Sequence, residues 1–406
     1  MPVIDVDAHF HEPFDWMDKH FPKLAAKLPG FDMSARIGDL IAGEFIAQIP
    51  KDARPDPADV MPEVFKQFLD QLPQGPVSGT VLERCIEDMS EEAGGPFRKC
   101  VREPGSVDSD DRIAVMDDQG IDVQFINPSF GLIPADRALN ELGSKTLQME
   151  CIAAYNSWTS DVVHQHRDRL LPVTYVVLDD VDWALAEMKR ARALGSRAFH
   201  VPAQPVGGRS LAHPDFEPVW ALAEDLGMAL IFHVAFSGQT TLADGWGNAG
   251  PNLLASMMTY RSQHFQVPTA ALTALIFGGV FERYPRLVAM SQELDTDWLP
   301  YWLKTIDSIC EKNVFSRTSP YTLPLKPSEY VQRNIFVSGL PTPLMQLQPA
   351  FDSVPTGILT FATDYPHLEG GPISNARQFY EEELANYSDH VKAEFFGNAV
   401  QRAMAL

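Results

Sequence analysis

The chain has 406 residues, of which 45% are hydrophobic and 21% are charged, and its formal net charge at pH 7 is -22. This length and apolar content can bury a large core, and α/β barrels routinely exceed the usual size of a single domain. The strong acidity argues against nucleic acid or an anionic membrane surface as a partner. No apolar run reaches the length of a transmembrane helix.

The cysteines and the start of the chain indicate a reducing compartment. The four cysteines contain no C-x-x-C pair, which argues against a structural zinc site or a disulfide framework. They are Cys85, Cys100, Cys151 and Cys310. The start "MPVIDVD" has no basic segment followed by an apolar one, so we expect no signal peptide and a cytoplasmic protein.

The first predicted element is a short apolar strand at 3–6. The apolar pattern is then lost over 14–105, which is rich in Pro, Gly and acidic residues. We interpret 14–105 as an insertion, either a lid or an interface arm, within one domain that spans 1–406.

A regular alternation of helices and strands begins at residue 108. Helix 108–120 has acidic residues at its start and a glycine at its end, as expected for a capped helix. In chain order there follow strand 122–127, helices within 135–167, strand 170–177, helix 179–195, strand 198–201, helix 215–227, strand 228–234, helix 269–285, strand 286–291, helix 295–312, strand 334–339, strand 358–363 and helix 389–406. About eight short strands separated by helices predict a (β/α)8 TIM barrel with a large irregular insertion after strand 1.

A doubly wound open sheet is the alternative, because periodicity alone does not distinguish the two folds. No G-x-G-x-x-G follows the first strand, and no G-x-x-x-x-G-K is present. The usual nucleotide sites of an open sheet are therefore missing from the sequence.

Histidines and acidic side chains recur where the predicted strands end, which is where a barrel carries its chemistry. They are Asp7, His9, His200, His233, Glu293 and Asp364, and the amide Gln292 precedes Glu293. Asp7 and His9 are spaced i and i+2, so both can point into the barrel mouth and hold one ion. Imidazole with carboxylate suits Zn²⁺, Fe²⁺ or Mn²⁺. His200 stands alone, and a structural role for it is as consistent with the sequence as a functional one.

Five segments resemble the amidohydrolase superfamily. They are "IDVDAHFHEP", "GGVFERYPRL", "DTDWLPYWL", "FATDYPHLEG" and "GNAVQR". More narrowly, they resemble the amidohydrolase-related branch that contains aminocarboxymuconate semialdehyde decarboxylase and γ-resorcylate decarboxylase. The resemblance covers 1–13 and about 108–406, and it does not extend to the segment between them.

The resemblance implies a metal site. Asp7 and His9 match the paired ligands of the first strand, and His233 matches the histidine ligand of strand five. Asp364 matches the aspartate after strand eight, which binds the metal and handles a proton. One position departs from the pattern, because Glu293 stands where the decarboxylases carry a strand-six histidine that acts as acid and base.

The leading hypothesis is hydrolysis of a small organic substrate, aromatic or cyclic, by a metal-activated water, with zinc the first choice and iron or manganese as alternatives. Asp364 or Glu293 would take the proton, and His200 or His264 would steady the oxyanion. Non-oxidative decarboxylation of an aromatic or muconate acid is the first alternative. The others are O2-dependent hydroxylation at a dinuclear iron or iron–manganese centre, with Glu293 as a ligand of the second metal, and an inactive partner subunit.

The expected partner is a small-molecule substrate. We also expect a homodimer or a higher oligomer, with a hetero-oligomer containing a related subunit as the alternative.

Overall fold

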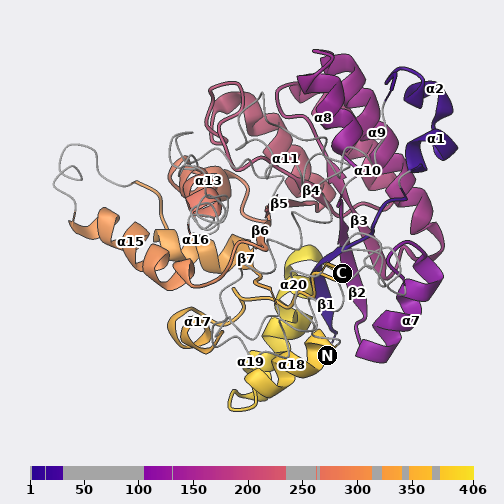
Figure 1. Cartoon of the computed structure of the whole chain (residues 1–406). Coiled ribbons are helices and arrows are strands. Elements are labelled where there is room, and N and C mark those ends of the chain that lie inside the picture. Colours follow the sequence, from indigo (N-terminus) through magenta and orange to yellow (C-terminus); the bar gives the residue numbers. More distant parts are fainter. Residues whose placement is uncertain are drawn as a thin grey trace, which may run out of the picture.

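The computed structural model describes residues 2–13, 15–30, 105–129, 131–234, 262, 266–312, 322–340, 347–367 and 375–406. Figure 1 shows strands at the centre of the molecule and helices around them.

Seven parallel strands form one sheet whose spatial order follows the sequence, β1 to β7. They are β1 (Ile4–His9), β2 (Val123–Asn127), β3 (Leu170–Tyr175), β4 (Ala198–His200), β5 (Ala229–His233), β6 (Ala289–Gln292) and β7 (Ile335–Val337). Every strand after the first pairs in parallel with the one before it, so the carboxyl ends of the strands share one rim.

The segment 358–365 takes the place of the eighth strand. It makes parallel bridges to β7 (Val337 with Leu359) and to β1 (Ala8 with Tyr365). Val6 N–H also donates to Phe361 O, with N and O 3.1 Å apart. These contacts close the sheet, so the predicted (β/α)8 barrel is confirmed, although the last strand consists of bridges rather than a regular ladder.

A buried carboxylate strengthens this closure. Asp5 accepts hydrogen bonds from the Thr363 backbone N–H (3.0 Å), the Thr363 hydroxyl (2.6 Å) and the Gln124 side chain (2.8 Å). Burial raises the pKa of Asp5 to about 7, and these hydrogen bonds oppose that rise. Asp5 therefore joins β1 to β2 and to the eighth segment, one layer below the rim.

Helices connect the strands and cover the outside of the barrel. They are α1 (Trp16–His20), α2 (Pro22–Ala25), α7 (Ser109–Gln119), α8 (Ile133–Asn140), α9 (Lys145–Val162), η1 (His164–His166), α10 (Val181–Ala193), η2 (Pro214–Phe216), α11 (Glu217–Leu226), α13 (Gln266–Phe277), α14 (Val280–Arg283), α15 (Trp298–Lys312), α16 (Pro327–Asn334), α17 (Gln348–Ser353), α18 (Ala376–Glu383), α19 (Asp389–Ala393), η6 (Glu394–Asn398) and α20 (Ala399–Met404). Among the helices described, none has both the length and the apolar composition that crossing a membrane requires.

Local chemistry explains where α7 begins and ends. The Asp108 side chain accepts from the N–H groups of Asp110 and Asp111, and Gly120 ends the helix in the left-handed region with φ 66°. Both features were expected from the sequence.

The predicted helix 389–406 is instead broken into α19, η6 and α20. A Cβ on Gly397 would lie 2.5 Å from Pro2 O and 3.1 Å from Ile4 N. The break therefore lets the terminal helix approach the first strand without a side chain between them.

The described part of the predicted insertion lies outside the barrel wall. Trp16 of α1 packs on Tyr155 and Trp158 of α9, with ring centroids 5.9 and 5.7 Å away. Residues 15–30 contain α1 and α2 and no strand. The rest of the predicted insertion, 31–104, lies outside the described residues.

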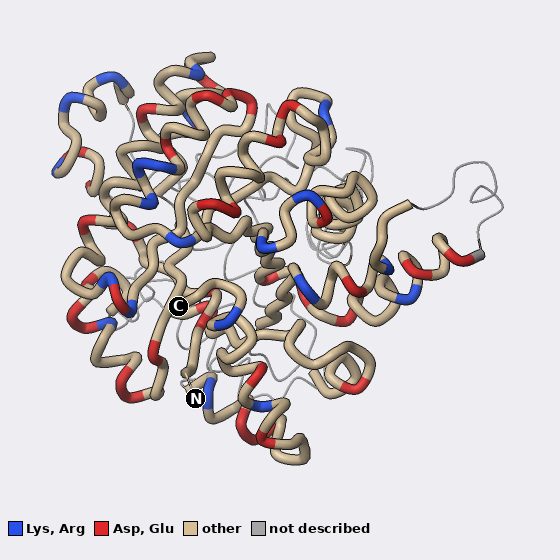
Figure 2. The backbone as a smooth tube through the Cα atoms, turned by 180° about the vertical axis from the view of Figure 1, so that it is seen from behind, with Lys and Arg blue, Asp and Glu red and all other residues tan. Residues whose placement is uncertain are grey.

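Figure 2 shows acidic and basic positions interspersed along the outer helices of the described chain. Mixed charge of this kind is typical of a solvated surface. The seven strands are mostly uncharged, and the acidic residues among them are Asp5 and Asp7 of β1.

Candidate metal centre

Asp7 and His9 lie at the carboxyl end of β1 and share one face of that strand. Both side chains are buried, with exposed fractions of 1% and 0%. Asp364 N–H donates to Asp7 O over 2.8 Å, and His9 N–H donates to Tyr365 O over 2.7 Å. Barrel closure therefore brings Asp364 beside the two residues of the first strand.

Backbone carbonyls orient the rings of His9 and His233. His9 Nδ1 lies 3.1 Å from Pro128 O, and His233 Nδ1 lies 2.8 Å from Val234 O. A carbonyl oxygen only accepts, so each Nδ1 carries a hydrogen and donates it. Each Nε2 then faces the site, and carbonyl bonds of this kind commonly orient metal-binding histidines.

The two Nε2 atoms face carboxylate oxygens. His9 Nε2 lies 3.3 Å from Asp7 Oδ1 and 3.4 Å from Asp364 Oδ1. His233 Nε2 lies 3.2 Å from Asp7 Oδ1 and 3.4 Å from Glu293 Oε2. Among the described residues, the buried His9 Nε2 has no hydrogen-bond partner.

Burial lowers the pKa of His9 to about 3, so this ring is neutral near pH 7 and its Nε2 carries a lone pair. A bare nitrogen and a carboxylate oxygen at this separation repel each other unless a cation lies between them. The donor arrangement therefore fits a divalent metal.

The potential ligand atoms form two overlapping groups, and within each group all atoms lie within 4.8 Å of one another. The first group is Asp7, His9, His233 and Glu293, and the second is His9, Glu293, Asp364 and His367. Histidine and carboxylate donors together suit Zn²⁺, Mn²⁺ or Fe²⁺. His9 and Glu293 belong to both groups, so the Glu293 carboxylate is itself a potential ligand.

The charges in the site depend on one another. Burial raises the pKa of Asp7, but His233 and His9 together outweigh burial and lower it. Burial lowers the pKa of His233, and Asp7, Glu293 and the hydrogen bond to Val234 together reverse that effect. Glu293 behaves differently: burial and then the Asp364 charge hold its pKa well above the usual range. Glu293 is therefore the carboxyl group most disposed to carry a proton.

Two of the acidic residues have unusual backbone conformations. Glu293 follows β6 with φ 56°, and Asp364 follows the eighth strand with φ 54°. Positive φ is uncommon outside glycine and costs on the order of 1–3 kcal/mol, and such residues cluster at functional sites.

His200 lies beside the donors and belongs to neither ligand group. Its ring is T-shaped to that of His233 at 5.7 Å and tilted to that of Tyr175 at 6.1 Å. Burial lowers its pKa well below the ordinary value, so the ring is neutral. His200 thus lines the site next to a candidate ligand.

Two aromatic residues close in sequence to the candidate ligands pack on a buried cation. Phe10 and Tyr365 face the buried guanidinium of Arg112, with Cζ 4.9 and 4.7 Å from their ring centroids. His264, the other residue expected to steady the oxyanion, lies outside the described residues.

Sequence reasoning missed two residues at the carboxyl end of β2. Asn127 Nδ2 donates to Asp7 Oδ1 over 2.6 Å, and Ser129 Oγ lies 3.0 Å from His367 Nε2. His367 Nδ1 in turn lies 2.9 Å from Asp364 Oδ1. The only signal in the sequence was their place after a predicted strand.

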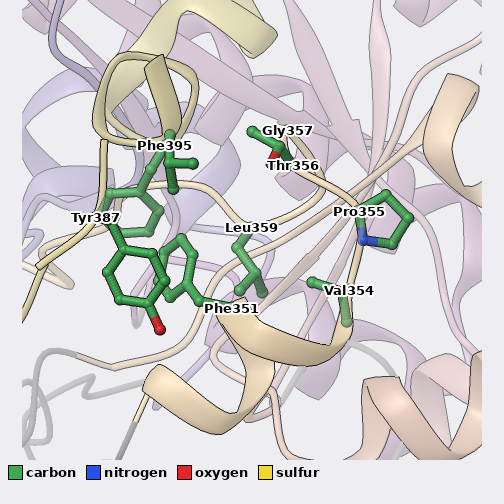
Figure 3. Close-up of a pocket in the computed structure, with 9 residues that line it drawn as sticks. Phe351, Val354, Pro355, Thr356, Gly357, Leu359, Tyr387 and Phe395 are labelled. Carbon is green, nitrogen blue, oxygen red and sulfur yellow. The ribbon is translucent and has the colours of Figure 1, made fainter. Parts of the chain in front are cut away.

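A cavity at the opposite end of the eighth strand is a poor candidate for a substrate site. It measures about 30 Å³ and adjoins 354–357, which precede the strand. Figure 3 shows the rings of Phe351, Tyr387 and Phe395 beside it. This volume holds only a few water molecules. The candidate ligands lie at the other rim, which carries Asp7 and Asp364.

Comparison with known proteins identifies relatives of the whole chain. The model of a family described as amidohydrolase matches residues 4–401. No curated protein matches the chain.

Several solved structures share the fold. An amidohydrolase from Mycobacterium avium subsp. paratuberculosis K-10 is 22% identical, with 99% of each chain covered and a TM-score of 0.68. A 5-carboxyvanillate decarboxylase from Sphingomonas paucimobilis is 19% identical over 100% of this chain and 99% of its own, with a TM-score of 0.58. A dihydroxybenzoic acid decarboxylase from Polaromonas sp. JS666, with bound manganese and the inhibitor 2-nitroresorcinol, is 16% identical over 100% and 97%, with a TM-score of 0.59.

Proposed function

Because the chain belongs to the amidohydrolase family, whose members include metal-dependent hydrolases and carboxy-lyases, we propose that it is a non-oxidative decarboxylase of a small aromatic or other unsaturated carboxylic acid. Decarboxylation was the first alternative to hydrolysis in the sequence analysis. The fold shared with a 5-carboxyvanillate decarboxylase and a manganese-bound dihydroxybenzoic acid decarboxylase supports that alternative over the leading hypothesis.

The observation that carries the proposal is the environment of Glu293. The resemblance places a histidine that acts as acid and base in decarboxylases of this branch at the position of Glu293, and the reaction needs an acid there. Burial and the neighbouring Asp364 raise the pKa of Glu293 well above its ordinary value. A raised pKa favours the protonated form, and a protonated carboxyl group can donate a proton as that histidine would.

Asp7, His9, His233 and Asp364 would hold the metal, with Glu293 beside them. A divalent ion bound there would supply positive charge that binds and polarises the substrate carboxylate. Glu293 would donate its proton to the ring carbon that bears the carboxylate, forming a C–H bond. The bond from that carbon to the carboxylate carbon then breaks, CO2 leaves, and Glu293 is left ionised until water returns the proton.

The identity of the metal and the oligomeric state remain proposals. Zinc is the sequence-based choice of metal, whereas manganese is bound in the dihydroxybenzoic acid decarboxylase. Both belong in the assay, together with Fe²⁺. A homodimer or higher oligomer also remains a prediction, which light scattering of the purified protein measures.

The test is CO2 release from a panel of hydroxybenzoates by protein loaded with Mn²⁺, Zn²⁺ or Fe²⁺. We expect Glu293→Gln to retain the metal and lose about 100-fold or more of the rate, as for other general acids. Glu311→Gln on the exposed end of α15 is the control and should keep full activity. Absence of CO2 with every loaded metal would overturn the proposal.

Hydrolysis is the second candidate, favoured by the position of Asp364 Oδ1 3.4 Å from the Nε2 of the candidate ligand His9, where a carboxylate could take a proton from a bound water. Cleavage of esters, lactones or amides without CO2 release would favour it. Two overlapping ligand groups also keep the dinuclear, O2-dependent alternative testable, since it requires two metal equivalents per chain and consumption of O2.

A further inference from the structure

Asn127, the last residue of β2, contacts the candidate ligand Asp7. Its side chain is fully buried. Asn127 Nδ2 lies 2.6 Å from Asp7 Oδ1 and 3.1 Å from Gln292 Oε1, and Gln292 Nε2 lies 2.5 Å from Val6 O.

The orientation of both amides follows from the acceptor at the end of this chain of hydrogen bonds. Val6 O can only accept, so the NH2 group of Gln292 faces it and Gln292 Oε1 faces Asn127. Asn127 must then present its own NH2 group to Gln292 Oε1. The same NH2 group has a second hydrogen, which it donates to Asp7 Oδ1.

This arrangement selects one oxygen of Asp7. Oδ1 is the atom that lies 3.3 Å from His9 Nε2 and 3.2 Å from His233 Nε2. The oxygen that Asn127 holds is therefore the one that shares a centre with both imidazole nitrogens. A hydrogen bond to a ligating carboxylate fixes its rotamer before the metal arrives.

The amide oxygen of Asn127 indicates that this side chain is not placed there to stabilise the fold. Among the described residues, Asn127 Oδ1 is buried and has no hydrogen-bond partner. A buried acceptor without a donor lowers the stability of a fold. An apolar side chain at this position would avoid that loss of stability, but Asp7 Oδ1 would then lack the hydrogen bond from Asn127.

We propose that Asn127, oriented by Gln292, is a positioning residue that holds Asp7 Oδ1 in the ligating orientation and so sets the metal affinity of the site. The proposal rests on the metal centre of the proposed function and is independent of whether the reaction is decarboxylation. The next two residues along the chain also contact histidines of the site: Pro128 O accepts from the ring of His9, and Ser129 Oγ contacts His367.

The experiment titrates metal-free protein with Mn²⁺ and with Zn²⁺, by calorimetry or competition with a chelator. Asn127→Ala should weaken binding about 10–100-fold, the usual loss when a partner of a ligand is removed. Gln292→Leu should act in the same direction, because Asn127 then loses its orienting acceptor.

Asn334→Ala is the matched control. Asn334 is also a buried asparagine whose NH2 group donates to two backbone acceptors, Pro285 O (3.1 Å) and Leu287 O (2.7 Å), but it lies before β7 at the far end of the strands. It should lower the melting temperature and leave metal affinity unchanged. Asn127→Ala should instead weaken metal binding and leave the melting temperature close to that of the wild type. A residue with only a structural role would not separate the two measurements in this way.

Circular dichroism shows which of Asn127→Ala and Gln292→Leu is folded. The metal affinity is then measured on the folded variant. Wild-type affinity in a folded variant overturns the role of Asn127 and leaves the proposed function intact. If the wild-type protein binds neither ion, the metal centre fails, and the proposed function fails with it.

Discussion

Replacing Arg112 by methionine should destabilise the protein by about 3 kcal/mol or more. Arg112 is fully buried and donates to Gly105 O (2.8 Å), Gln124 Oε1 (3.1 Å) and His9 O (2.5 Å). Methionine fills similar volume but leaves these three acceptors without that donor, and each such loss costs about 1–3 kcal/mol. Relief from burying a cation offsets part of this cost, so the lower end of the range is expected.

The assay is urea unfolding of the metal-free protein, with Arg112→Lys beside Arg112→Met. Lysine keeps the charge but has no planar fork, so it should recover only part of the lost stability. Because Arg112 holds the carbonyl of His9, Arg112→Met should also weaken Mn²⁺ binding. A loss below about 1 kcal/mol with unchanged metal affinity would refute the reasoning, since it would mean that the buried hydrogen bonds contribute almost nothing net.

Other predictions concern the metal, a surface ion pair and one glycine. Chelation should abolish activity and lower the melting temperature, and added Mn²⁺ or Zn²⁺ should restore both; full activity after exhaustive chelation would contradict the metal centre. The hydrogen bonds from Arg402 lower the pKa of Glu394 below its ordinary value of 4.5. Their stabilisation should therefore be present above that value and disappear as the pH falls through the lowered pKa, so unfolding of the wild type and of Glu394→Gln should converge in acid and differ at neutral pH. Gly397→Ala should destabilise the fold by about 1–3 kcal/mol, because its Cβ would lie 2.5 Å from Pro2 O; a melting temperature equal to that of the wild type would show that the terminal helix can move away from β1.

The sequence by itself determined the order of elements and the rim at which the candidate ligands lie. Capping residues and hydrophobic periodicity are local, which is why the start of α7 at Asp108 and its end at Gly120 were predicted. The spacing of Asp7 and His9 is also local, since two residues along a strand return to the same face. Family motifs then predicted that His233 and Asp364 would join them.

Only the tertiary structure decided which side chains meet. Convergence depends on how the barrel closes and in which register neighbouring strands pair, and neither is encoded within a short window. Closure of 358–365 onto β1 brings Asp364 to His9, and the positive φ of Glu293 accompanies its place among the donors. Asn127 could not have been found from sequence, because its role depends on one hydrogen bond between neighbouring strands and on an amide orientation passed from Val6 through Gln292. Local pattern therefore determined what each strand end carries, whereas the three-dimensional closure of the sheet decided which of those side chains share a centre.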